Sequence, residues 1–100
     1  MAHQRTPQAS EASINTVIRL LHGLVTYGPR DLAIADAMSS KGYDAVKWAE
    51  GQSMLAELVS SDVPTESTVA AASAWYDEAQ LAARQALAAQ PRLLAKLGLN

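Results

Sequence analysis

The sequence predicts an all-α fold, an antiparallel bundle of about four helices followed by a short C-terminal helical turn. Apolar residues recur at three- and four-residue spacing along most of the chain, which is the period of amphipathic helices. No stretch alternates Val, Ile or Thr at the period of a strand, and no Asn-Gly hairpin turn occurs. Short breaks containing glycine or proline separate the periodic segments, as in antiparallel bundles. Without a linker or internal repeat, residues 1–100 are expected to form one domain, frayed over residues 1–10.

The first predicted helix has the clearest amphipathic pattern. We expect it to begin near Thr6 and Pro7, because Thr can cap a helix and Pro suits its first position. Its apolar face comprises Ile14, Val17, Ile18, Leu21, Leu24 and Val25. The segment "TYGPRD" ends this helix, because Gly28 can adopt a left-handed conformation and Pro29 cannot continue the hydrogen-bond ladder.

Two shorter helices are predicted next. The second runs from Pro29 to about Ser40, with Gly42 as its C-terminal cap, and Asp44 can cap the start of the third. The apolar arc of the third helix contains Trp48, Gly51, Leu55, Leu58 and Val59. Gly51 costs about 1 kcal/mol of helix propensity relative to Ala. We therefore expect Gly51 to leave a notch for an aromatic ring or a crossing helix.

The fourth predicted helix, from about Pro64 to Ala89, has a wide apolar arc. One edge of the arc is marked by Val69, Ala72, Tyr76, Ala79, Ala83 and Leu87, and it extends over Ala71, Trp75, Ala82 and Ala89. Such a helix contacts two neighbours or a second chain.

The C-terminal segment is predicted to be a helical turn with a docking face. Pro91 can restart the helix, and Gly98 fits a left-handed cap. The candidate docking tail consists of Leu93, Leu94, Leu97 and Leu99, with Leu99 brought back onto Leu94. This stripe packs over its own bundle or a sister chain, or it is a motif offered to another protein.

The predicted core is thin, because alanine supplies 20 of the 100 residues and phenylalanine is absent. A buried Ala methyl contributes about 0.8 kcal/mol, against about 1.5–3 kcal/mol for a buried Leu or Ile. A thin core gains stability when two chains bury a shared surface, so we expect a homo-oligomer, with a dimer favoured. The candidate interface comprises Ile14, Val17, Leu21, Leu24, Ala72, Tyr76, Ala79 and Ala83.

Charge argues against nucleic acid and anionic membranes as partners. The net charge is -2, and the basic residues are scattered. The segment "MSSKGYDAVKWAEGQSML" has the shape of a helix-turn-helix, but its second helix carries Asp44, Glu50 and Glu57 against Lys47 alone. We expect no nucleic acid and no membrane as partner. The polar N-terminal segment lacks an apolar signal region, so we expect a cytoplasmic protein.

No set of residues predicts catalysis, a cofactor or a metal site. The lack of cysteine excludes thiolate ligands and nucleophiles. Neither His3 nor His22 has the Glu-x-x-His spacing of metal sites in bundles, and His22 is expected to be partly buried beside the apolar stripe. No Gly-x-Ser-x-Gly elbow or phosphate-binding loop occurs. The sequence therefore predicts a protein that is not an enzyme and has no cofactor.

The segments "GYDAVKWAEGQSMLAEL" and "WYDEAQLAARQALAAQPRLLAKLGL" resemble a group of uncharacterised bacterial helical proteins. The shared pattern consists of Gly42, Tyr43, Gly51, Ala86, Leu87, Pro91, Leu93, Leu94, Leu97 and Gly98. The resemblance implies a small helical bundle in a bacterial cytoplasm, and it implies no catalytic residue, cofactor or substrate.

Two hypotheses about function follow. The leading one is a non-enzymatic, self-associating helical bundle that serves as a scaffold or protein-interaction module, with the first and fourth helices forming most of the interface. The alternative is a bundle that binds a small apolar ligand in a pocket near Trp48, Trp75 and Tyr76.

Overall fold

The computed structural model describes residues 10–61 and 63–99, which form five α-helices and no β-strand. The helices are α1 (Glu11–Tyr27), α2 (Leu32–Ser39), α3 (Ala45–Ser60), α4 (Glu66–Ala86) and α5 (Pro91–Lys96). The predicted all-α fold is therefore confirmed, with α5 as the short C-terminal helical turn.

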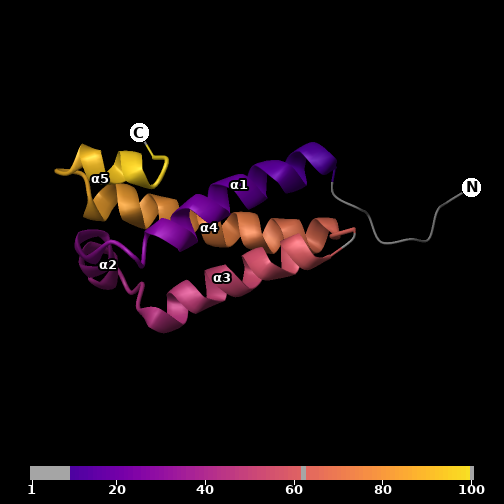
Figure 1. Cartoon of the computed structure of the whole chain (residues 1–100), viewed down its shortest axis with the longest axis horizontal. Coiled ribbons are helices and arrows are strands. Elements are labelled where there is room, and N and C mark those ends of the chain that lie inside the picture. The colour runs from indigo at the N-terminus through magenta and orange to yellow at the C-terminus, as the bar shows by residue number, and fades with distance from the viewer. Residues whose placement is uncertain (1–9, 62, 100) are drawn as a thin grey trace, which may run out of the picture.

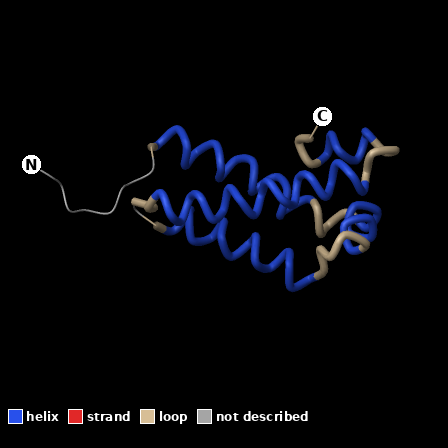
Figure 2. The backbone as a smooth tube through the Cα atoms, turned by 180° about the vertical axis from the view of Figure 1, so that it is seen from behind, coloured by secondary structure: helices blue, strands red, loops and turns tan. Residues whose placement is uncertain are grey.

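Three long helices form the body of the molecule, and the two short ones lie at one end of it (Figure 1). Helix α3 runs antiparallel to α1 and α4, and α1 contacts both of them. Helix α2 crosses the end of the bundle and is seen almost end-on in Figure 2, where it contacts α4. With 8 residues, α2 is only about 12 Å long, too short to run beside α1 as a fourth full-length helix.

The core is a single apolar cluster to which every helix contributes. Its buried members are Leu21, Leu24, Val25, Ile34, Met38, Tyr43, Trp48, Leu58, Val69, Ala72, Trp75, Tyr76, Ala79, Ala83, Leu87, Leu93, Leu97 and Leu99. No polar or charged residue among the described positions is buried. Val59 was predicted to face this core, but it is 64% exposed, because Leu58 occupies the inward position of that turn.

Side-chain caps determine where the helices begin. Helix α1 begins at Glu11, because Ser10 is extended and its hydroxyl accepts the amide N–H of Ser13. Thr6 and Pro7, where the sequence predicted the start of this helix, lie outside the described residues. Asp44 caps α3 as predicted, accepting from the amide of Lys47. Asp31 caps α2, which therefore begins after the predicted Pro29. Thr65 in the same way starts α4 after Pro64, and α4 ends at Ala86 rather than Ala89.

Two glycines end helices as predicted. Gly42 and Gly98 have positive φ angles of 91° and 78°. In each case the next residue donates its amide N–H to a carbonyl five residues back, from Tyr43 to Met38 and from Leu99 to Leu94. This is the hydrogen-bond pattern of the Schellman motif, and it turns Tyr43 and Leu99 into the core.

The prediction for Gly28 was wrong, because its φ of -55° is right-handed. Glycine is required there by a close approach, since a Cβ at this position would lie 2.5 Å from Cη2 of Trp48.

Candidate functional site

Three buried aromatic rings, from the start of α3 and from α4, form a cluster. The ring centroids of Tyr43, Trp48 and Trp75 lie 5.9 to 6.4 Å apart in all three pairs, which is within the range of favourable aromatic contacts. Trp75 packs against Gly51, where a Cβ would lie 2.5 Å from Cη2 of the ring. The predicted notch at Gly51 is therefore confirmed, and an indole ring fills it.

The residues of the candidate ligand pocket lie in this packed region. Trp48 and Trp75 are 4% and 6% exposed, and Tyr76 is also buried. The cavities described below are lined by other residues. Burial raises the pKa of the Tyr43 hydroxyl, and the nearby carboxylates of Glu78 and Glu50 raise it further. Nε1 of Trp75 is buried without a hydrogen-bond partner.

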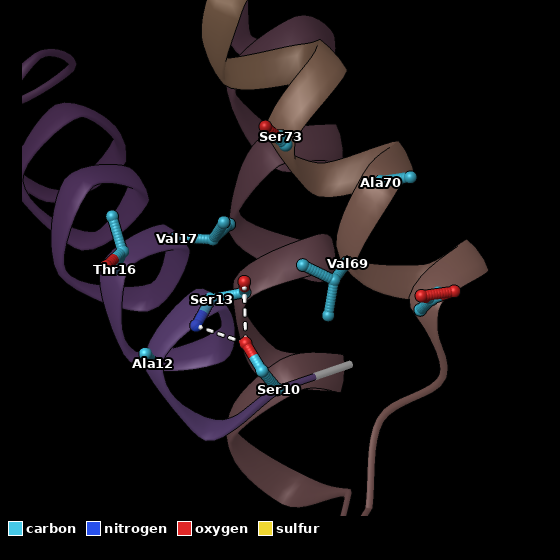
Figure 3. Close-up of a pocket in the computed structure, with 9 residues that line it drawn as sticks. Ser10, Ala12, Ser13, Thr16, Val17, Val69, Ala70 and Ser73 are labelled. Carbon is cyan, nitrogen blue, oxygen red and sulfur yellow. Dashed lines mark hydrogen bonds between the residues drawn. The ribbon is translucent and has the colours of Figure 1, made fainter. Parts of the chain in front are cut away.

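A cavity of about 850 Å³ lies between the N-terminal halves of α1 and α4 (Figure 3). It is lined by Ser10, Ala12, Ser13, Thr16, Val17, Glu66, Val69, Ala70 and Ser73. The Ser10 hydroxyl donates to that of Ser13, 2.8 Å away, and accepts the Ser13 amide, so it serves as the cap of α1. Among the described residues that line this cavity, Glu66 is the single titratable one, and none is a histidine or lysine that could activate the hydroxyls.

The candidate interface on α1 and α4 belongs mostly to the core of the single chain. Leu21, Leu24, Ala72, Tyr76, Ala79 and Ala83 are all buried by other helices of the same chain, and only Ile14 and Val17 are half-buried. Helices α1, α2 and α3 all contact α4, and these six residues are covered by them. Ala71 and Ala89, which were predicted to extend the apolar arc of α4, are exposed. The expectation for His22 was also wrong, since its side chain is exposed and its ring lies edge-on to that of Tyr27.

The candidate docking tail packs against its own chain. Leu93, Leu97 and Leu99 are buried, and Leu94 is half-buried against the same core. An ion pair of 2.9 Å joins Lys96 in α5 to Asp31, the cap of α2. The hydrogen bond from Lys96, together with that from the amide of Ile34, holds the pKa of Asp31 below its ordinary value.

The outward side of α3 is a surface that the sequence analysis missed. Ten residues of α3 are exposed, among them Glu50 and Glu57. The other eight are uncharged and form the α3 outer face: Ala45, Val46, Ala49, Gln52, Ser53, Ala56, Val59 and Ser60. Val46 and Val59 are 70% and 64% exposed. Figure 1 shows α3 along one long edge of the bundle.

Among the described residues, no three His, Asp or Glu side chains are grouped closely enough to hold a metal ion. None of the described helices is long and apolar enough to cross a membrane. No family model, curated protein or solved structure matches the chain.

Proposed function

We propose that the protein is a non-enzymatic, self-associating helical module that serves as a scaffold or protein-interaction unit in the cytoplasm. The observation that supports this proposal best is the α3 outer face, which carries two exposed valines among small and polar side chains. Two valines that are both more than half exposed add apolar surface, and such surface is typical of a contact site.

The size of the side chains also favours a helical partner on this face. Ala49, Ser53 and Ala56 lie along its middle, and side chains as small as these allow a second helix to approach closely. The contact surface that we propose is thus on α3, since most of the apolar residues on α1 and α4 are buried within the chain. The alternative of a small apolar ligand near Trp48 and Trp75 has no supporting observation, because the rings pack against each other and against Gly51.

Sedimentation equilibrium of the untagged chain tests the proposal. Across a concentration series from micromolar to millimolar, we expect the average mass to rise reversibly from that of the monomer, 10.6 kDa, towards twice that value. A mass that stays at 10.6 kDa over the whole series contradicts self-association.

A further inference from the structure

Two adjoining cavities lie where the C-terminal end of α1, the start of α2 and α5 meet. The larger, of about 380 Å³, is lined by Tyr27, Arg30, Asp31, Ile34 and Lys96. The smaller, of about 290 Å³, lies between α1 and α5 and shares Tyr27 and Lys96 with the larger one. Figure 1 shows α2 and α5 at the same end of the bundle. Small-molecule sites have volumes of about 300–1,000 Å³, so the larger cavity has room for a small ligand.

The charge of these cavities differs in sign from that of the whole chain. Among the described residues that line them, Arg19, Arg30 and Lys96 are basic, and Asp31 is the single acidic one. The two linings together therefore carry a formal charge of +2, against -2 for the chain. A concave surface lined by one sign of charge concentrates ligands of the opposite sign. The ligand that these cavities favour is thus an anion.

Lys96 is held beside the larger cavity by an ion pair. Its ammonium group donates to Oδ2 of Asp31 at 2.9 Å. The other oxygen of this carboxylate, Oδ1, accepts from the amides of Ala33 and Ile34, so the carboxylate is fixed to the start of α2. A lysine ammonium group has three N–H donors, and two of them remain for a ligand. Because the ammonium group is already positioned, a ligand that binds it orders less of the side chain.

Tyr27 and Arg30 provide two further groups for a ligand. The Tyr27 side chain borders both cavities and is 49% exposed, although it is large and aromatic. The ring of His22 packs against it with 6.5 Å between the centroids, a contact that helps to hold the Tyr27 ring in place. Arg30 is exposed and has no ion pair with another described residue. A guanidinium group can bind a carboxylate through two parallel hydrogen bonds.

We propose that Tyr27, Arg30 and Lys96 form a binding site, the Tyr27 site, for a small molecule that carries an aromatic ring and one carboxylate. The ligand's ring stacks on Tyr27, and its carboxylate accepts from the Arg30 guanidinium and the Lys96 ammonium group. A carboxylate suits the site better than a phosphate, because Asp31 repels a dianion more strongly than a monoanion. The inference goes beyond the proposed function and does not depend on self-association.

Indole-3-acetate is the probe, and indole-3-acetamide, which has nearly the same shape but no charge, is its control. In two-dimensional NMR of the isotope-labelled chain, we expect indole-3-acetate to shift the amide signals of Tyr27, Arg30 and Lys96 along a saturating curve. The dissociation constant should be on the order of 1 mM, which is typical of a ligand of this size. The amide should bind at least about fivefold more weakly, because it cannot form hydrogen bonds assisted by its own charge.

Three variants test the residues of the Tyr27 site. Arg30→Gln should weaken the binding of indole-3-acetate about tenfold, because it removes a charge-assisted contact. Arg92→Gln removes an exposed basic charge from α5 outside both linings, and should change the dissociation constant less than about twofold. Tyr27→Leu keeps every charge but removes the ring, and should weaken binding about threefold or more. All three positions are exposed, so the variants should keep the helical circular dichroism of the natural chain.

The titrations separate a specific site from a general attraction of anions. Saturable shifts around Tyr27 that require both the carboxylate and Arg30 support the site. The absence of saturable shifts at millimolar concentrations, or equal binding of the acid and its amide, overturns it. An equal loss of affinity in Arg30→Gln and Arg92→Gln overturns it as well. If a capped Trp-Glu dipeptide binds more tightly than indole-3-acetate, the carboxylate comes from a peptide segment of a partner, and the small molecule is overturned as the ligand.

Discussion

Replacing Gly51 by alanine tests whether the aromatic cluster is as tightly packed as its geometry indicates. The new Cβ would lie 2.5, 2.7 and 2.8 Å from three carbons of the Trp75 ring, well inside normal contact distance. The ring is buried and is flanked by Tyr43 and Trp48, so it has little room to move. Overpacking of this kind costs about 1–3 kcal/mol. Alanine also gains about 1 kcal/mol of helix propensity over glycine, which leaves a net loss of about 0–2 kcal/mol.

Gly23→Ala is the matched control. Gly23 lies inside α1, and a Cβ there would meet only the carbonyl oxygen of Leu97, at an ordinary distance of 3.8 Å. This variant is expected to gain about 1 kcal/mol from helix propensity. Because both variants share that gain, the difference between them isolates the overlap with Trp75, about 1–3 kcal/mol.

The assay is urea and thermal unfolding of both variants, followed by far-UV circular dichroism. A difference of 1 kcal/mol corresponds to about 4–8 °C in a domain of this size, so Gly51→Ala should melt at least about 4 °C below Gly23→Ala. In a Trp75→Phe background the three overlapping ring carbons are absent, and Gly51→Ala should then stabilise as Gly23→Ala does. Equal melting of the two variants in the natural background would refute the argument.

Three further predictions concern the tail, the core and acid pH. Removing residues 91–100 exposes the core that Leu93, Leu97 and Leu99 cover, at a cost of about 5–9 kcal/mol from about 1.5–3 kcal/mol per leucine. The free energy of unfolding of domains of this size is about 5–15 kcal/mol, so the truncated chain should lose most or all of its cooperative thermal unfolding. An unchanged melting curve would contradict the packing of the tail against its own chain. Leu21→Glu places a carboxylate at a fully buried position and should lower the free energy of unfolding by about 3–5 kcal/mol. The measurement is the helicity of the monomer, which should fall. Unchanged stability would show that Leu21 is accessible to water. The pKa of Asp31 is lowered below 3.8 in the folded state, so its stabilising contribution is present above about pH 4 and is lost as the pH falls through the folded pKa. When the pH falls below the folded pKa of Asp31, hydrogen exchange of the α5 amides should become faster than its intrinsic pH dependence predicts. Asp31→Asn keeps a capping oxygen for α2 and should lack this acceleration.

Periodicity and turn chemistry predicted much of the fold, because they depend on neighbouring residues. The apolar stripe of α1, the caps at Asp44 and Gly42, and the Schellman turn at Gly98 were all predicted and confirmed. Gly51 was predictable for a related reason, since a glycine on the buried arc of a helix implies a close neighbour. Gly28 was not, because its close neighbour is Trp48, twenty positions later, and the segment "YGP" is equally typical of a left-handed turn.

The candidate interface was the main error, and its cause is physical. A wide apolar arc shows that a helix is covered on several sides, but it does not show whether the cover belongs to the same chain. Here the cover of Ala79 and Ala83 comes from helices of the same chain, and α5 extends the core further. The sequence predicted Glu50, Ser53 and Glu57 opposite the apolar arc of this helix, and the structure adds the exposed Val46 and Val59 to that side.

Because the core is closed within one chain, folding does not depend on self-association. The sequence suggested that a thin, alanine-rich core needs a second chain for stability. The structure compensates for the thin core within one chain, through the packed aromatic rings beside Gly51 and through the leucines of the tail. Contact through the α3 outer face therefore adds little to folding. Ala49→Glu should weaken self-association, while the free energy of unfolding of the monomer stays within about 0.5 kcal/mol of that of the natural chain at low concentration. If the variant unfolded instead, Ala49 would be part of the fold rather than of a contact surface.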